Sequence, residues 1–192
     1  MYQKGLPRVE DLAYKEYVRV FWRMNFTIFF ATSTGKTEDI ADKLKELLPS
    51  SETRDVDDLN SVSEFTNAEA LVCCIPTWNT GADEDRSGTA WDSYIKDISN
   101  LDLTGKPVAI IGLGDSSSYS DYFCDAMEEL YTAFSQSGAK MIGKVPIDGY
   151  TFNASKSVID GQFCGLPLDE DNEPDLSDER LSTWIEQIKV EA

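Results

Sequence analysis

Two short apolar runs constrain the fold of this chain more than any other feature of its sequence. Residues 70–75 (ALVCCI) and 107–112 (PVAIIG) carry no charged side chain. A strand of that kind has to be covered on both faces, as the strands of parallel sheets are. Further strands are predicted at 26–31, 52–56 and, as a split last strand, at about 139–142 with 162–166. Helices are predicted between them, at 37–48, 61–66, 88–97, 121–137 and 177–190. This alternation predicts an α/β fold with a doubly wound, five-stranded parallel sheet.

The charge balance narrows the possible functions. The 192 residues include 35 acidic and 17 basic side chains and no histidine, which gives a net charge of −18. The chain therefore shows no basic stripe for nucleic acid, and it offers no Ser-His-Asp triad and no histidine metal site. The excess of carboxylates favours a basic protein partner. The cysteines form no Cys-x-x-Cys pair and are interpreted as buried free thiols: Cys73, Cys74, Cys124 and Cys164.

The first 25 residues differ from the rest of the chain. They carry five basic and three acidic side chains, so their net charge is +2 and that of residues 26–192 is −20. Apolar residues recur among them at roughly helical spacing. We expect residues 1–25 to be an N-terminal extension, either an ordinary helix or the remnant of a targeting peptide, and residues 26–192 to be one domain. No run is long enough to span a membrane.

The segment Ala31-Thr-Ser-Thr-Gly-Lys-Thr-Glu38 follows the first predicted strand and opens the first predicted helix. It resembles a nucleotide triphosphate loop, but the first glycine of that motif would stand at position 30, where the chain has Phe30. What remains is Gly35 for a close turn, three threonine hydroxyls and the unpaired N–H groups of a helix start. A serine or threonine helix cap would explain one hydroxyl, not three. The segment predicts a site for one compact phosphate monoester.

Two further loops leave strands at the same edge of the predicted sheet. Pro76-Thr-Trp-Asn-Thr-Gly81 follows residues 70–75, and Gly112-Leu-Gly-Asp-Ser-Ser-Ser-Tyr119 begins at the end of residues 107–112. Each loop carries glycines and one large aromatic residue, Trp78 or Tyr119. Taken alone, such an aromatic residue is more often core packing. Beside a phosphate loop, at the edge where doubly wound sheets bind ligands, the pair predicts a flat ring held between two aromatic side chains. A phosphate joined to a flat heterocycle describes flavin mononucleotide (FMN).

At these three loops the sequence resembles the flavodoxins, over residues 26–192. The resemblance implies the strand order 2-1-3-4-5 with FMN as the cofactor. Residues 148–161 resemble the insertion that splits the last strand in the long-chain branch of that family. Residues 79–91 resemble the longer loop of the eukaryotic algal members, which implies a plastid protein.

The resemblance also implies a set of binding residues. The phosphate is expected at the hydroxyls of Thr32, Thr34 and Thr37 and at the amides of Ser33, Gly35 and Lys36. Trp78 and Tyr119 are expected to sandwich the isoalloxazine ring, and the Asn79–Thr80 peptide to face flavin N5. Asp171 is expected near the ribityl chain. The pyrimidine edge is expected at Asp115 and at Asp121, Tyr122, Phe123 and Cys124, with Tyr122 standing where the family usually has asparagine. The remaining predicted contacts are Pro76, Thr77, Gly81, Leu113 and Gly114.

The function that the resemblance implies is that of a low-potential one-electron carrier, not an enzyme, and of a monomer that needs no metal. In algal plastids the family carries electrons from photosystem I to ferredoxin–NADP reductase in place of ferredoxin. These are the expected partners, and the plastid stroma is the expected location if the chain is algal; otherwise it is the cytoplasm. An FMN-dependent NAD(P)H quinone reductase on the same fold is the alternative, although an aromatic on each ring face leaves no open face for a quinone. A receiver-type signalling module would need acids after the first strand, where Ala31-Thr32-Ser33 stands.

Overall fold

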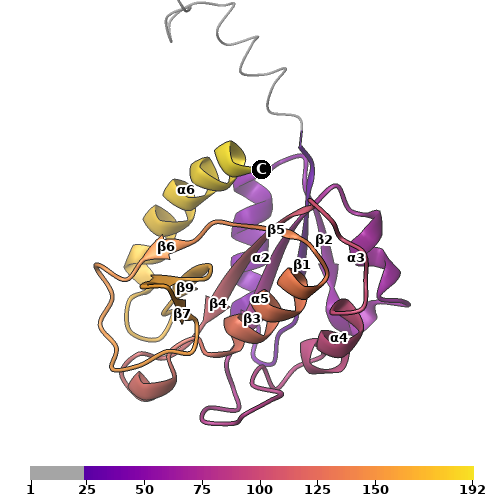
Figure 1. The fold of residues 1–192 in the computed structure, drawn as a ribbon. Helices are drawn as coiled ribbons and strands as arrows, with labels where there is room; N and C mark the ends of the chain where they lie inside the picture. Colours follow the sequence, from indigo (N-terminus) through magenta and orange to yellow (C-terminus); the bar gives the residue numbers. More distant parts are fainter. Residues whose placement is uncertain (1–23) are drawn as a thin grey trace, which may run out of the picture.

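The computed structural model of the protein describes residues 24–192. The predicted N-terminal extension lies almost entirely outside the described residues. The sheet has the predicted parallel strands in the order β2-β1-β3-β4-β5, which confirms the predicted topology (Figure 1). The strands are β1 (Phe26–Phe30), β2 (Glu52–Asp55), β3 (Ala70–Pro76), β4 (Pro107–Leu113) and β5 (Lys140–Ile142). Every residue of β3 and β4 is buried, as strands covered by helices on both faces require.

The last strand position is split, as predicted, but its second piece lies later than expected. β5 pairs with the start of β4 (Pro107 with Lys140), and β9 (Leu166–Leu168) pairs with its end (Ile111 with Leu166). The prediction of 162–166 was wrong because Phe163 belongs to a separate aromatic cluster, packed at 5.1 Å between ring centroids against Phe152. Phe163 lies in β8 (Gln162–Phe163), which forms a small antiparallel sheet with β6 (Val145–Pro146) and β7 (Val158–Ile159).

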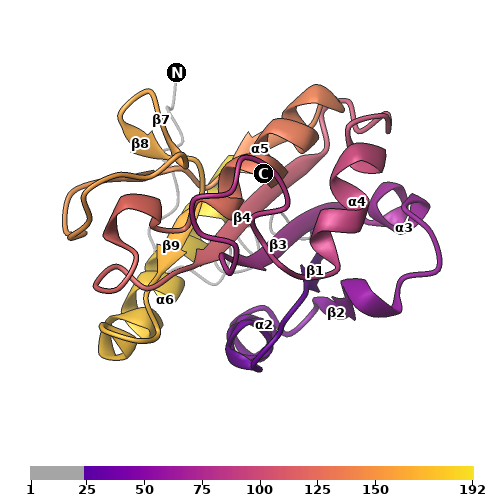
Figure 2. The same cartoon turned by 90° about the horizontal axis from the view of Figure 1, so that it is seen from below.

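Helices cover both faces of the sheet. Figure 2 shows α2 and α6 on one face and α3, α4 and α5 on the other. Their bounds are α2 (Lys36–Leu47), α3 (Ser63–Asn67), α4 (Trp91–Ile98), α5 (Ala126–Gln136) and α6 (Pro174–Glu191), with short 3-10 turns at Val56–Asp58 and Ser120–Tyr122. Helix α6 begins three residues before the predicted start, because Pro174 suits a first helical position. Helix α5 begins five residues late, because Cys124 takes a left-handed φ of 55°.

Aromatic packing fixes the helices that lie over β1, β3 and β4. The Phe65 ring of α3 stacks on Trp91 of α4, with 5.8 Å between the ring centroids, and Trp91 donates a 2.8 Å hydrogen bond from Nε1 to the carbonyl of Cys74. All four cysteines are buried and free, as predicted. Burial raises the pKa of the Cys164 thiol to about 12, so these thiols stay protonated. Among residues 24–192 no helix is long and apolar enough to cross a membrane.

Candidate functional site

A cavity of about 360 Å³ lies at the carboxyl ends of β1, β3 and β4. β1 lies between β2 and β3 in the sheet, so the connections leaving β1 and β3 diverge there, and this is the position at which doubly wound sheets bind ligands. All three sequence-predicted loops reach the cavity, together with the loop that follows β9. The lining residues are Thr34, Lys36, Thr37, Pro76, Thr77, Trp78, Leu113, Gly114, Asp115, Tyr119, Glu170 and Asp171.

The loop after β1 is shaped by Thr32 and Gly35. Gly35 takes a φ of 92°, a left-handed conformation that favours glycine. Its backbone N–H donates to Oγ1 of Thr32 over 2.9 Å. Helix α2 then begins at Lys36, beside the cavity. The first N–H groups of a helix have no acceptor within the helix, so those of α2 are available to a ligand there. Thr37 is buried and lines the cavity.

Lys36 supplies the ammonium group among the cavity-lining side chains. It forms an ion pair with Asp171, which links the loop after β1 to the loop after β9. Both side chains are about half exposed, so the pair is worth little to folding. The Lys36 ammonium is therefore free to exchange its carboxylate partner for another anion at low energetic cost.

Trp78 projects from a backbone that is fixed on both sides. The preceding Thr77 donates its N–H to the carbonyl of Leu113 at the end of β4, over 3.0 Å. Oγ1 of Thr77 accepts a 3.2 Å hydrogen bond from the N–H of Ala126, at the start of α5. The Trp78 side chain itself is 49% exposed. An indole that contributes so little to the core, on a backbone held so firmly, is suited to contact a ligand.

The loop after β4 presents Tyr119, which is 50% exposed. Its N–H donates to the carbonyl of Asp115 over 3.0 Å. Oδ1 of Asp115 accepts from the N–H groups of Ser117 and Ser118. Burial raises the pKa of Asp115, but these hydrogen bonds lower it by more, so the carboxylate stays charged and holds the loop. Gly114 is required here, because a Cβ would lie 2.8 Å from the backbone nitrogen of Cys124.

Asp169 is a site-building residue that the sequence interpretation missed. It is fully buried at the end of β9. One carboxylate oxygen accepts from the N–H and the hydroxyl of Ser116, at 2.9 and 2.6 Å. The other accepts from the N–H groups of Asp171 and Asn172. Asp169 therefore ties the Tyr119 loop to the loop that carries Glu170 and Asp171, and its place directly after a strand that ends at this edge was the available signal.

The remaining predicted residues do not line the cavity. Phe123 and Cys124 are buried in the core, and the N–H of Phe123 donates to the carbonyl of Ala154 over 3.3 Å. Tyr122 is 41% exposed, and its ring lies against Gly81, where a Cβ would be 3.3 Å from it. The rest lie on the loops flanking the cavity: Thr32, Ser33, Gly35, Asn79, Thr80, Gly81 and Asp121.

The charges around the cavity are mostly negative. Asp115, Glu170 and Asp171 line it, against the single ammonium group of Lys36. Carboxylates this close disfavour any further negative charge in the cavity beyond the reach of Lys36. The arrangement suits a ligand whose anionic group lies at the start of α2 and whose body is neutral.

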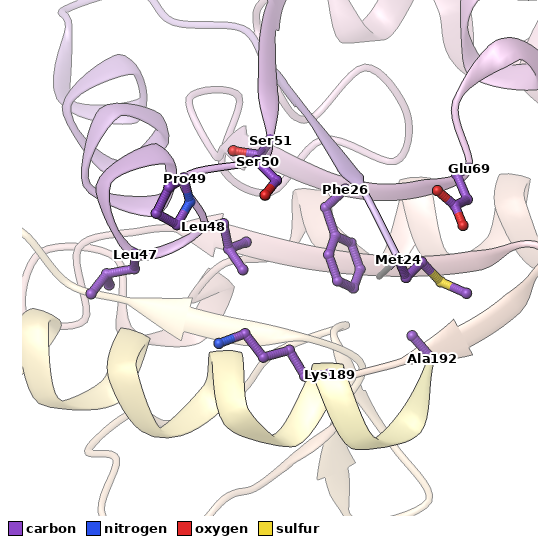
Figure 3. A pocket seen from close by; sticks show the side chains of 10 residues that line it. All are labelled: Met24, Phe26, Leu47, Leu48, Pro49, Ser50, Ser51, Glu69, Lys189 and Ala192. Atoms are coloured by element: carbon purple, nitrogen blue, oxygen red, sulfur yellow. The ribbon is translucent and has the colours of Figure 1, made fainter. Parts of the chain in front are cut away.

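A second cavity, of about 400 Å³, lies at the opposite end of the sheet (Figure 3). It is lined by Met24 and Phe26 of the β1 segment, by the end of α2 and by the end of α6. Its charged groups are engaged elsewhere: Glu69 accepts from the N–H of Asn25, and Lys189 pairs with Glu186 at 2.8 Å. The hydroxyls of Ser50 and Ser51 belong to residues that line it too, and that of Ser51 is buried without a hydrogen-bond partner in residues 24–192. Among the described residues, the lining has no glycine loop and no exposed aromatic side chain, so we do not take this cavity as the candidate site.

Comparisons with known proteins agree with this geometry. The family model for flavodoxin matches residues 28–184. The flavodoxin of Synechococcus elongatus is 37% identical over 166 residues, which cover 85% of this chain and 95% of that protein. Flavodoxin 1 of Salmonella typhimurium is 36% identical and covers similar shares, 85% and 92%. A crystal structure of Fusobacterium nucleatum flavodoxin bound to flavin mononucleotide superposes with a TM-score of 0.79 at 34% identity, over 87% of this chain and 98% of that one.

Proposed function

Because this chain belongs to the flavodoxin family, we propose that it holds FMN at the carboxyl edge of its sheet and carries single electrons between other proteins. One observation supports this most strongly: a single cavity joins a phosphate-type loop to two half-exposed aromatic side chains, Trp78 and Tyr119. The cofactor-binding domain spans residues 26–192, and residues 1–25 precede it as an extension.

We assign the phosphate of FMN to the start of α2. Thr34 and Thr37 line the cavity there, and each carries a hydroxyl that can donate to an anion. Thr32 accepts a hydrogen bond from the Gly35 N–H, and its own hydroxyl proton stays available for an anion. Since Gly35 uses its N–H in this way, the amides of Ser33, Lys36 and the first helical turn contribute more. The ammonium of Lys36 adds charge when it leaves Asp171 for the phosphate.

We assign the two faces of the isoalloxazine ring to Trp78 and Tyr119. Asn79 and Thr80 follow Trp78 directly, which supports their peptide as the contact to flavin N5. At the pyrimidine edge the Phe123 N–H is already bound to Ala154. The contacts there are therefore assigned to the remaining backbone groups of residues 121–124 and to Asp115.

When bound, FMN supplies the electron chemistry, and the charges and hydrogen bonds of the chain set the free energy of its reduction. Asp115, Glu170 and Asp171 line the cavity as carboxylates, so adding negative charge to the ring costs more here than in water. The N–H groups of Trp78 and Asn79 are held by the Arg86 carbonyl, so the carbonyl of the 79–80 peptide would be available to accept a hydrogen bond from a protonated flavin N5. Both features favour transfer of one electron at low potential.

We further propose that the chain is a long-chain member of the algal, plastid type, acting between photosystem I and ferredoxin–NADP reductase. Residues 143–165 form the insertion between β5 and β9, and flavodoxins of several cyanobacteria are 35–38% identical to the chain. Exposed acids of the loop after Trp78, Asp83 and Glu84, would attract a basic partner face. Association with such a reductase should slow steeply with ionic strength; a flat dependence would contradict this.

The experiment that tests the function is stepwise anaerobic photoreduction of the purified protein, followed by absorption. A yellow protein that passes through a long-lived blue form supports one-electron transport. Direct bleaching in one two-electron step, together with oxidation of NADH in the absence of a reductase, would favour a quinone reductase. A colourless protein that does not bind added FMN would refute the assignment of the cavity.

A further inference from the structure

Arg86 is a buried arginine in the loop between β3 and α4, and only 2% of its surface is exposed. Its guanidinium pairs with Glu128, and its Nε lies 3.1 Å from Glu129 Oε2. Its backbone N–H also donates to Glu129, over 2.9 Å. Both glutamates belong to α5. Burial lowers the pKa of Arg86, but the two carboxylates raise it by more, so the group stays charged.

The carbonyl oxygen of Arg86 holds the segment that carries Trp78. It accepts hydrogen bonds from the N–H groups of both Trp78 and Asn79, each over 3.1 Å. The Asn79 side chain donates in turn to the carbonyl of Asp85 over 2.6 Å. Asp85 has a left-handed φ of 56°, which turns the chain so that residue 86 faces residues 78 and 79.

The chain after Arg86 is fixed as well, so the loop cannot simply follow a displaced Trp78. Asp92, in the first turn of α4, accepts from the N–H groups of Ser87 and Gly88, at 3.2 and 2.8 Å. At Gly88 a Cβ would lie 2.9 Å from the Cβ of Trp78, so the chain around residue 88 packs directly against the chain around residue 78. The position of residues 78–80 therefore depends on Arg86 and on its anchorage to α5.

We propose that Arg86 is a positioning residue for the cofactor site: through Glu128 and Glu129 it fixes the Trp78–Thr80 segment and so sets the potential of the first one-electron reduction. It does not line the cavity, and it acts only through the backbone that it holds. This inference rests on the proposed function for its redox part, whereas its structural part can be tested without FMN.

The test compares Arg86→Met with Arg86→Lys and with a matched control, Arg54→Met. Arg54 is half exposed and pairs with Glu52 within β2, at 2.8 Å, far from the loop in the sheet order. Methionine keeps the apolar stem of the side chain and removes the guanidinium with its charge, which leaves the buried Glu129 and the part-exposed Glu128 without their cation. Lysine keeps the charge but cannot reach both carboxylates with a planar fork, so it should rescue only partly.

Two readouts separate positioning from general stability. In the FMN-free protein, hydrogen exchange of the Trp78 and Asn79 amides should accelerate by about tenfold more in Arg86→Met than that of amides in β4. The carbonyl of residue 86 that accepts from both amides is kept, but the segment that carries it loses its side-chain anchor to α5 and opens more often. In the loaded protein, the equilibrium constant of the first one-electron reduction should change by about tenfold as well. The ratio of FMN to riboflavin affinity should stay unchanged, because the phosphate loop is untouched.

Several outcomes would overturn the proposal. One is a folded Arg86→Met protein in which the two amides and the potential match the parent; another is an acceleration shared equally by all amides. If Arg86→Met does not fold, Glu129→Gln replaces it, because this change weakens the anchor of the Arg86 N–H and keeps the arginine paired with Glu128. If the parent protein binds no FMN, the proposed function fails, while the amide measurement still decides the role of Arg86.

Discussion

The carboxylate of Asp169 allows the sharpest test of how the cofactor edge is built. It is fully buried, and it joins Ser116 to the loop after β9 across 53 residues of sequence. Asparagine at this position keeps the shape of the side chain but offers one acceptor oxygen in place of two. If that oxygen stays with the amides of Asp171 and Asn172, the N–H of Ser116 faces an NH₂ group.

The expected loss follows from that single mismatch. A hydrogen bond to a charged group contributes about 1.5–3 kcal/mol, and a buried N–H left without an acceptor carries a penalty of similar size. Rotation of the Ser116 hydroxyl recovers part of the loss, because it can accept from the new NH₂ group. We therefore expect Asp169→Asn to lower the free energy of unfolding by about 2–3 kcal/mol at neutral pH.

The effect should depend on pH in one direction. Burial raises the pKa of Asp169, but hydrogen bonds from Ser116 and Asn172 lower it by more, so the pKa in the folded protein lies below the ordinary value. The stability that this carboxylate contributes is present above the unfolded pKa of about 3.9. It is lost as the pH falls through the lower, folded value. The difference between parent and variant should therefore narrow on acidification.

Urea unfolding at several pH values measures the loss in unfolding free energy. The FMN-free protein is used because bound cofactor would add its own stabilisation. The matched control is Asp178→Asn, which removes an exposed carboxylate paired with Lys43 at 2.9 Å and should cost less than about 1 kcal/mol. The reasoning is refuted if Asp169→Asn costs no more than the control. It is refuted equally if the difference from the parent is as large in acid as at neutral pH.

Three more changes test the site itself. Trp78→Ala should weaken FMN binding by about 1–3 kcal/mol, the range found for a base stacked on an aromatic side chain; an unchanged affinity in a fluorescence titration would remove Trp78 from the site. Thr34→Val should weaken FMN far more than riboflavin, because only FMN carries the phosphate, and equal losses for both ligands would show that the loop does not contact it. Gly114→Ala should destabilise the fold by about 1–3 kcal/mol, because its Cβ would lie 2.8 Å from the Cys124 nitrogen and 3.0 Å from its sulfur; an unchanged melting temperature would contradict this close approach.

The strands could be predicted where burial on both faces requires every side chain of a strand to be apolar. β3 and β4 are covered on both faces, so their residues are apolar throughout, and their observed bounds differ by one residue from the predicted ones. The helix starts were less predictable, because they depend on local conformation. Cys124 adopts a left-handed φ that a glycine would normally signal, and nothing in the sequence marks this cysteine as the point before which α5 cannot begin.

The site also has a part that could be predicted from the sequence and a part that could not. Trp78, Tyr119 and Thr34 lie on the loops that follow β3, β4 and β1, so their arrival at one cavity follows from the topology of a parallel sheet. Asp169 and Arg86 were missed because their roles depend on partners far away in the chain. In the sequence Asp169 stands in an acidic run that is typical of a solvated loop. Only the folded chain brings Ser116, 53 residues earlier, to its carboxylate, and the hydrogen bonds from Ser116 offset part of the cost of burying the charge.

The loops of this site are held largely by anions. Asp115, Asp169, Glu129 and Asp92 each accept hydrogen bonds from backbone N–H groups of the loops that line or support the cavity. Carboxylates are charged, so they are stronger acceptors for these N–H groups than neutral side-chain oxygens are. Asp115 also lines the cavity, so one of the carboxylates that hold the loops would also oppose the arrival of an electron on a bound cofactor. If the chain carries electrons on FMN as proposed, weakening the rigidity of these loops at Arg86 or Asp169 should therefore also change the reduction potential.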